Sequence, residues 1–171
     1  VRHKALYLTA VSRLGACWAS EHLGFDRAHG PAGLFGTGCL LPPRQTIDGV
    51  VASALRICEL ASSLTVPFAF ESCVNYLKPR PDEMTDGAFV SAVATVADCG
   101  ILLDLPALRA NERHGRQSIE EFLAEIPLER VLELHLGGDG LAEGAGSDGD
   151  ASDLDLARRV VPMLPNLGAI I

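Results

Sequence analysis

The amino-acid sequence predicts an α/β fold: a partial (β/α)₈ TIM barrel with about five βα units, forming a single incomplete barrel domain over residues 1–171. Short apolar runs of strand length alternate with longer stretches that have helical periodicity. Because a helix between two consecutive strands allows a crossover connection, the strands are expected to be parallel. No glycine-rich phosphate-binding fingerprint follows any predicted strand, which disfavours a dinucleotide-binding fold.

The first part of the chain predicts a helix, a strand and a long connection. The helix spans 4–14 and is expected to end at Gly15, because glycine is favoured in the left-handed conformation that closes helices. The apolar run 16–19 predicts a strand that ends in Ser20-Glu21-His22. The Gly- and Pro-rich stretch 24–44 is too long for a simple connection and predicts a functional or mobile loop.

Further βα units follow this loop. Thr46 can cap the first of their helices, and Ser118 with Glu121 has the spacing of a capping box. The predicted helices are 46–64, 85–97, 118–126 and 153–164, and the predicted strands are 67–70, 100–103, 131–134 and 167–171. Because the chain opens on a helical pattern and closes on an apolar strand, we expect both ends to be cut from a longer barrel. Such a piece is expected to be weakly active or inactive alone and to aggregate or dimerise through its open strand edges.

The composition limits the classes of function that the chain can perform. Its formal net charge of −8 disfavours a nucleic-acid surface, because a polyphosphate would be repelled. The apolar runs are short and interrupted by charge, so no membrane span is expected. The five cysteines are odd in number and form no CxxC pair, which indicates neither a disulfide framework nor a thiolate zinc site. Most of them are expected to be core residues of a cytoplasmic protein.

A residue that can bind a metal ends each of four successive predicted strands: His22, Glu71, Asp104 and His135. The last three are spaced by 33 and 31 residues, about one βα unit each. In a parallel barrel the carboxyl ends of all strands meet at one face, so these side chains are expected to converge. Imidazoles mixed with carboxylates suit iron, manganese or zinc better than calcium. The alternative is that an acidic residue after a strand only caps a helix or lies in a loop.

Six segments of the chain carry a resemblance to a known family: Ser20-Glu21-His22-Leu23, Phe70-Glu71 with Tyr76, Leu102-Leu103-Asp104, Asn111-Glu112-Arg113-His114-Gly115, Val131-Leu132-Glu133-Leu134-His135-Leu136 and the tail 164–171. In this combination they resemble the multinuclear non-heme iron-dependent oxidases, the family that includes the methanobactin-biosynthesis oxidase. The resemblance covers most of the chain. It implies a xylose-isomerase-like TIM barrel from which about three N-terminal strands are absent here.

The resemblance implies that His22, Glu71, Asp104 and His135 are metal ligands. It also makes Asp148 the acidic member of a family Asp-x-His pair, whose second position is Asp150 in this sequence. The implied cofactor is two or three iron ions, with manganese, zinc or magnesium as alternatives. The implied activity is the dioxygen-dependent oxidation of a peptide, often at cysteine. A precursor peptide and a small recognition protein are the implied partners.

The sequence departs from the family pattern at several positions. Ser72 replaces an asparagine, and Asp139 and Asp150 replace histidines. Carboxylates in place of imidazoles add negative charge, which leaves the number and identity of the metal ions open. Two other functions therefore stay open. One is a divalent-metal sugar isomerase or phosphodiesterase of the xylose-isomerase-like barrel type, and the other is a degenerate barrel that only binds.

Overall fold

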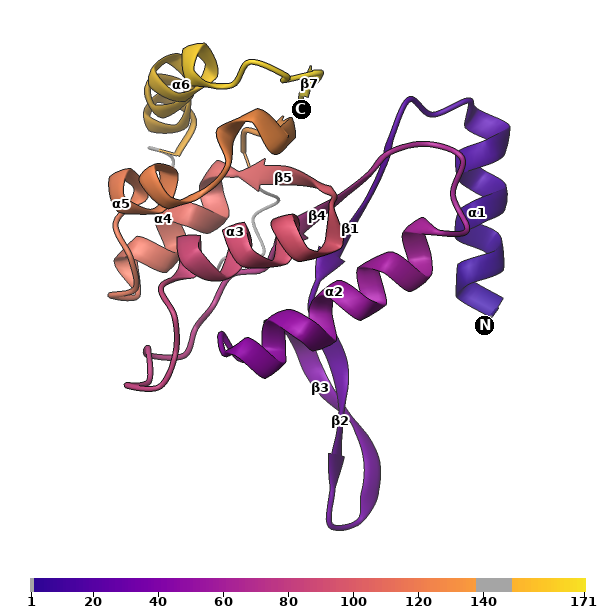
Figure 1. Cartoon of the computed structure of the whole chain (residues 1–171). Helices are drawn as coiled ribbons and strands as arrows, with labels where there is room; N and C mark the ends of the chain where they lie inside the picture. The colour runs from indigo at the N-terminus through magenta and orange to yellow at the C-terminus, as the bar shows by residue number, and fades with distance from the viewer. Residues whose placement is uncertain (1, 138–148) are drawn as a thin grey trace.

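The computed structural model describes residues 2–137 and 149–171 and confirms a partial TIM barrel of parallel strands and helices (Figure 1). The elements in chain order, with η for 3₁₀ helices, are α1 (Arg2–Leu14), β1 (Ala19–Leu23), β2 (Phe25–Gly30), β3 (Gly33–Leu41), α2 (Ile47–Ala61), β4 (Phe68–Ser72), α3 (Asp86–Ala97), β5 (Gly100–Asp104), α4 (Leu105–Arg113), α5 (Ile119–Glu125), η1 (Leu128–Arg130), β6 (Val131–His135), α6 (Gly149–Val160), η2 (Val161–Met163) and β7 (Ala169–Ile170). The main sheet has the order β1-β4-β5-β6-β7, and each neighbouring pair is parallel.

Local capping signals set the helix boundaries as the sequence predicts. The Thr46 side chain accepts a hydrogen bond from the Gly49 amide at the start of α2. Ser118 and Glu121 form the predicted capping box of α5. Gly15 follows α1 with a φ of +60°, the left-handed conformation that glycine adopts without a steric penalty.

Side-chain alternation gives the main sheet two different faces. Phe68 and Phe70 of β4 lie against α2, where they line a pocket of about 330 Å³ with helix residues such as Ile57. Alternate residues of a strand point to opposite faces, so Ala69 and Glu71 lie on the other face. Helices α2 and α3 pack beside each other over the first face (Figure 1). The polar site residues therefore occupy the face that these helices leave uncovered.

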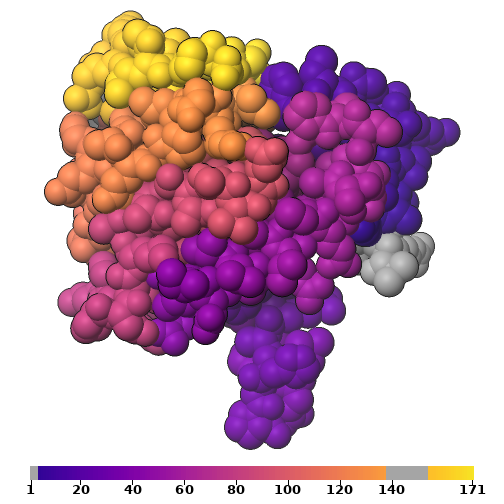
Figure 2. Space-filling view, viewed as in Figure 1, coloured from indigo at the N-terminus to yellow at the C-terminus, as the bar shows by residue number. Residues whose placement is uncertain are grey.

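The stretch after β1 differs from the sequence-based expectation. Instead of an irregular loop it forms an antiparallel hairpin of β2 and β3, which projects from the body of the protein (Figures 1 and 2). Pro31 and Ala32 form the turn, and Gly33 follows with a φ of +106°. Both strands are largely exposed, with Phe35 half accessible to solvent. The alternation of apolar and polar residues that reveals a half-buried strand is therefore missing from their sequence.

Helix α4 was not predicted, although its signals are present in the sequence. Asp104 ends β5 and is also the N-cap of α4, where its Oδ1 accepts a hydrogen bond from the Ala107 amide at 2.6 Å. Pro106 occupies the first turn, a position where its missing N–H costs nothing. The strand thus passes directly into a helix, which leaves the Asp104 side chain little freedom.

The expectation for the cysteines was wrong for most of them. Only Cys99 is buried and Cys73 is partly buried, whereas Cys17, Cys39 and Cys58 are exposed, and all five are free thiols. The exposed cysteines lie before β1, on the projecting hairpin and in the last part of α2. No helix within the described ranges is both long enough and apolar enough to cross a membrane.

Candidate metal centre

Strand register places the four predicted ligands at one end of the main sheet. His22 of β1 lies directly opposite Glu71 of β4, and Asp104 of β5 lies directly opposite His135 of β6. The strands are parallel, so all four residues lie at or next to their carboxyl ends. The structure therefore brings together side chains that lie far apart in the sequence, since His22 and His135 are 113 positions apart.

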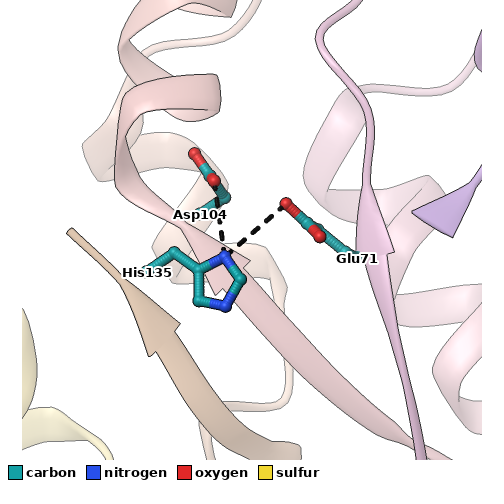
Figure 3. A group of neighbouring side chains, drawn as sticks. All are labelled: Glu71, Asp104 and His135. Carbon is teal, nitrogen blue, oxygen red and sulfur yellow. Dashed lines mark ion pairs between the residues drawn. The ribbon is translucent and has the colours of Figure 1, made fainter. Parts of the chain in front are cut away.

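Three of these residues are close enough to share one cation. Glu71, Asp104 and His135 each offer a ligand atom, and these atoms all lie within 4.8 Å of one another (Figure 3). His135 Nδ1 is 3.7 Å from Asp104 Oδ2 and 4.0 Å from Glu71 Oε1. Ligand atoms around a transition metal are about 2.0–2.2 Å from the ion and thus up to roughly 4 Å apart. The arrangement fits one imidazole and two carboxylates around a metal.

His22 approaches the same centre from the other side of Glu71. Its Nε2 lies 3.2 Å from Glu71 Oε2, whereas His135 faces Glu71 Oε1. The two oxygens of one carboxylate therefore face two different imidazoles. The Glu71 side chain is 11% exposed and the His22 side chain is 52% exposed, so the centre has a buried side and an open side.

The electrostatics of the cluster favour an additional positive charge. The pKa of Glu71 is raised above its ordinary value of 4.5, mainly because the carboxyl is buried. His22 and His135 lower this pKa, while the nearby Asp104 carboxylate raises it. Two carboxylates in a partly desolvated place need either a shared proton or a cation. A bound metal would replace the proton, so metal binding and proton release are coupled here.

Asp104 combines the two roles that the sequence left open as alternatives. Its Oδ1 caps α4 by accepting the hydrogen bond from Ala107, and its Oδ2 faces His135. Different oxygens serve the two contacts, so capping does not compete with metal binding. The cap fixes the rotamer that turns Oδ2 toward the cluster.

Sequence reasoning missed two residues next to the cluster, Glu133 and Trp18. Glu133 is buried in β6, and its Oε1 lies 3.0 Å from His135 Nε2. Its Oε2 accepts a hydrogen bond from Trp18 Nε1 at 2.8 Å. The signal that could have identified Glu133 is its position two residues before His135, since residues i and i+2 of a strand share a face.

Polar contacts from α4 and its C-terminal end support the segment that follows Glu71. Asn111 accepts a hydrogen bond from the Asn75 amide at 2.7 Å, and both residues are buried. The Arg116 guanidinium pairs with Asp86 and donates a hydrogen bond to the Leu77 carbonyl. Asn111, in the segment that the sequence singled out by resemblance, and Arg116, directly after that segment, thus hold the loop that follows the predicted ligand Glu71.

The remaining predicted site residues are not tested by the structure. Asp148 and Asp139 lie outside the described residues, and at Asp150 only the backbone at the start of α6 is described. Ser72 is the last residue of β4 and is partly buried. The ligand roles of Asp148 and Asp150 therefore stay predictions.

Comparison with known proteins gives one family. Residues 3–164 match the family model described as "RiPP precursor modification enzyme MbnB/TglH/ChrH". Similar curated proteins include the UPF0276 proteins of Anaeromyxobacter sp. (strain Fw109-5), with 31% identity over 80% of this chain and 47% of the relative, and of Shewanella loihica, with 35% identity over 70% and 41%. The UPF0276 protein of Neisseria meningitidis serogroup B is 35% identical over 75% of this chain and 44% of the relative. The chain thus spans about half the length of these relatives.

Proposed function

Because the chain belongs to the MbnB/TglH/ChrH family of RiPP precursor modification enzymes, we propose that the full-length protein is an iron-dependent oxidase acting on a peptide. RiPP denotes a ribosomally synthesised and post-translationally modified peptide, so the proposed substrate is a precursor peptide. Cysteine is the proposed target residue. A small recognition protein that presents the peptide, and a cytoplasmic location, are further parts of the proposal.

The convergence of Glu71, Asp104 and His135 within 4.8 Å is the observation that carries this proposal. One nitrogen and two oxygen donors form a mixed ligand set that suits iron and also suits manganese or zinc. Glu71 faces His22 with one oxygen and His135 with the other, which supports a carboxylate shared by two ions. A third ion would require ligands such as Asp148 and Asp150.

Iron, when bound, would supply the redox chemistry with dioxygen. The residues of the chain would hold it and limit the access of water. Glu71 and Asp104 would neutralise its charge from the buried side, and the cap on α4 would keep the Asp104 oxygen in place. The half-exposed His22 marks the open side, from which a peptide would reach the centre.

Metal analysis of the anaerobically purified full-length protein tests the proposal. We expect two or more iron ions per chain, and loss of iron in a Glu71→Gln variant. Asp82→Asn is the matched control, because Asp82 is exposed and, among the residues that the structure describes, pairs only with Arg44. Incubation with dioxygen and a short cysteine-containing peptide encoded beside the gene should change the mass of that peptide.

Other metal contents would point to the alternative functions. A single zinc ion, or paired magnesium or manganese ions, would favour a sugar isomerase or phosphodiesterase, because those barrels use metals as Lewis acids. A full-length protein without tightly bound metal would favour a barrel that only binds. Either result would overturn the oxidase proposal.

A further inference from the structure

We infer that Glu133 is a positioning residue that holds the Nε2–H of His135 and thereby makes Nδ1 the nitrogen that binds the metal. This inference rests on the proposed metal centre, and it concerns a residue that does not touch the metal itself. Glu133 therefore supports the site from behind the ligands that the strand ends provide.

The two nitrogens of the His135 ring have different surroundings. Nδ1 faces Asp104 Oδ2 at 3.7 Å and Glu71 Oε1 at 4.0 Å. Nε2 lies 3.0 Å from Glu133 Oε1, on the other side of the ring. Figure 3 shows one ring nitrogen turned toward both carboxylates of the cluster while the other nitrogen points away from them.

Hydrogen-bond chemistry then determines which nitrogen is free for a metal. A neutral imidazole has one N–H donor and one acceptor nitrogen, and an ionised carboxylate can only accept. Glu133 therefore favours the tautomer in which Nε2 carries the proton and Nδ1 carries the lone pair. A carboxylate behind a metal-binding histidine fixes the ring orientation in this way and also makes the ligand more basic.

Glu133 is itself held in place by Trp18. Its second oxygen accepts the hydrogen bond from Trp18 Nε1, so both oxygens of this buried carboxylate have a partner. The Trp18 ring lies close to Gly168, where an added Cβ would come within 3.0 Å of the ring atoms. The small residue before β7 thus leaves the space that the tryptophan needs to reach Glu133.

Nitrogen-15 NMR of the full-length protein tests the tautomer without relying on activity. The protein, labelled in its histidine rings, is loaded with diamagnetic Zn²⁺, and the His135 signals are assigned by their loss in a His135→Asn variant. We expect a protonated Nε2 and a metal-bound Nδ1. A metal-bound Nε2 would overturn the inference.

Metal affinity in variants provides the second test. Glu133→Gln should weaken Fe²⁺ binding by about 10- to 100-fold in a chelator competition, the usual effect of removing such a partner. Glu133→Asp should restore part of the loss, and Trp18→Phe should weaken binding less. Glu129→Gln is the matched control, because Glu129 is exposed and its contact within the described part of the chain is the hydrogen bond that its backbone carbonyl accepts from Asn166.

The outcomes separate this inference from the proposed function. If the wild-type protein binds iron and Glu133→Gln binds it equally well, the inference is wrong and the proposed function stands. If the wild-type protein binds no iron, the proposed function fails. The zinc-loaded NMR result needs no folded Glu133 variant, so it decides the inference even where Glu133→Gln does not fold.

Discussion

The two sides of the metal centre differ in how firmly the protein holds their side chains. On the buried side, Asp104 caps a helix and His135 is hydrogen-bonded to Glu133. On the open side, His22 comes from β1, the edge strand of the described sheet, and its side chain is half exposed. A ligand is therefore held rigidly where a second contact uses its remaining polar atom. The buried side is expected to determine the affinity for the metal, and the open side is expected to let other molecules reach the metal centre.

Replacing Asp104 should have the largest effect, because one side chain both binds and caps. Asp104→Ala should abolish tight metal binding and also destabilise the metal-free protein by about 1 kcal/mol, the usual cost of losing an N-cap. Asp104→Asn should weaken metal binding but keep the cap, since asparagine caps helices well. Iron content and urea unfolding of the two variants check this. Equal metal-free stability of both variants would contradict the double role.

Glu71→Gln should change how the stability of the metal-free protein depends on pH. The pKa of Glu71 is raised in the folded state, so the folded protein retains a proton that the unfolded chain has already released. Stability should therefore fall as pH rises from about 4.5 through the raised pKa. The glutamine variant should lose this decline. Urea unfolding across that range measures it, and parallel curves for both proteins would refute the assignment.

His22→Ala should have a smaller effect than any change on the buried side. The imidazole is half exposed and contacts only one oxygen of Glu71 within the cluster, so its loss should leave thermal stability nearly unchanged. We expect the iron content to fall by about one ion while the ion held by the other three residues remains. Metal analysis checks this. Complete loss of iron would show that the two sides act as one unit.

The projecting hairpin should give the smallest effect and sets the baseline for the comparison. Phe35→Ser changes an exposed side chain on the hairpin, for which no contact with the cluster is described. We expect iron content to stay the same and stability to change by no more than about 0.5 kcal/mol, as for other surface positions. A thermal melt and metal analysis suffice. A drop in iron content would place the hairpin in the metal centre.

The sequence predicted those parts of the fold that local rules determine. Buried strands are short apolar runs and Thr46 and Ser118 are strong caps, so the parallel sheet and these helix starts were predicted. The expectation that the carboxyl ends of parallel strands meet at one face also identified Glu71, Asp104 and His135, which the structure brings together. The family assignment from short motifs was confirmed by the family match.

The missed features depend on contacts that no local pattern records. The hairpin of β2 and β3 is exposed, so burial imposes no apolar alternation on it. Glu133 was missed because only the last residue of each strand was considered, whereas the face of a strand includes the residue two positions earlier. Its partner Trp18 is 115 residues away in sequence, and only the folded sheet brings the two together.

A crystal structure of the iron-loaded full-length protein, with anomalous scattering recorded at the iron edge, tests the central claim most directly. We expect iron about 2.0–2.2 Å from Glu71, Asp104 and the Nδ1 of His135. We also expect Glu133 to remain hydrogen-bonded to Nε2 on the far side of the ring. Iron bound elsewhere, with Glu71, Asp104 and His135 free of metal, would refute this metal centre.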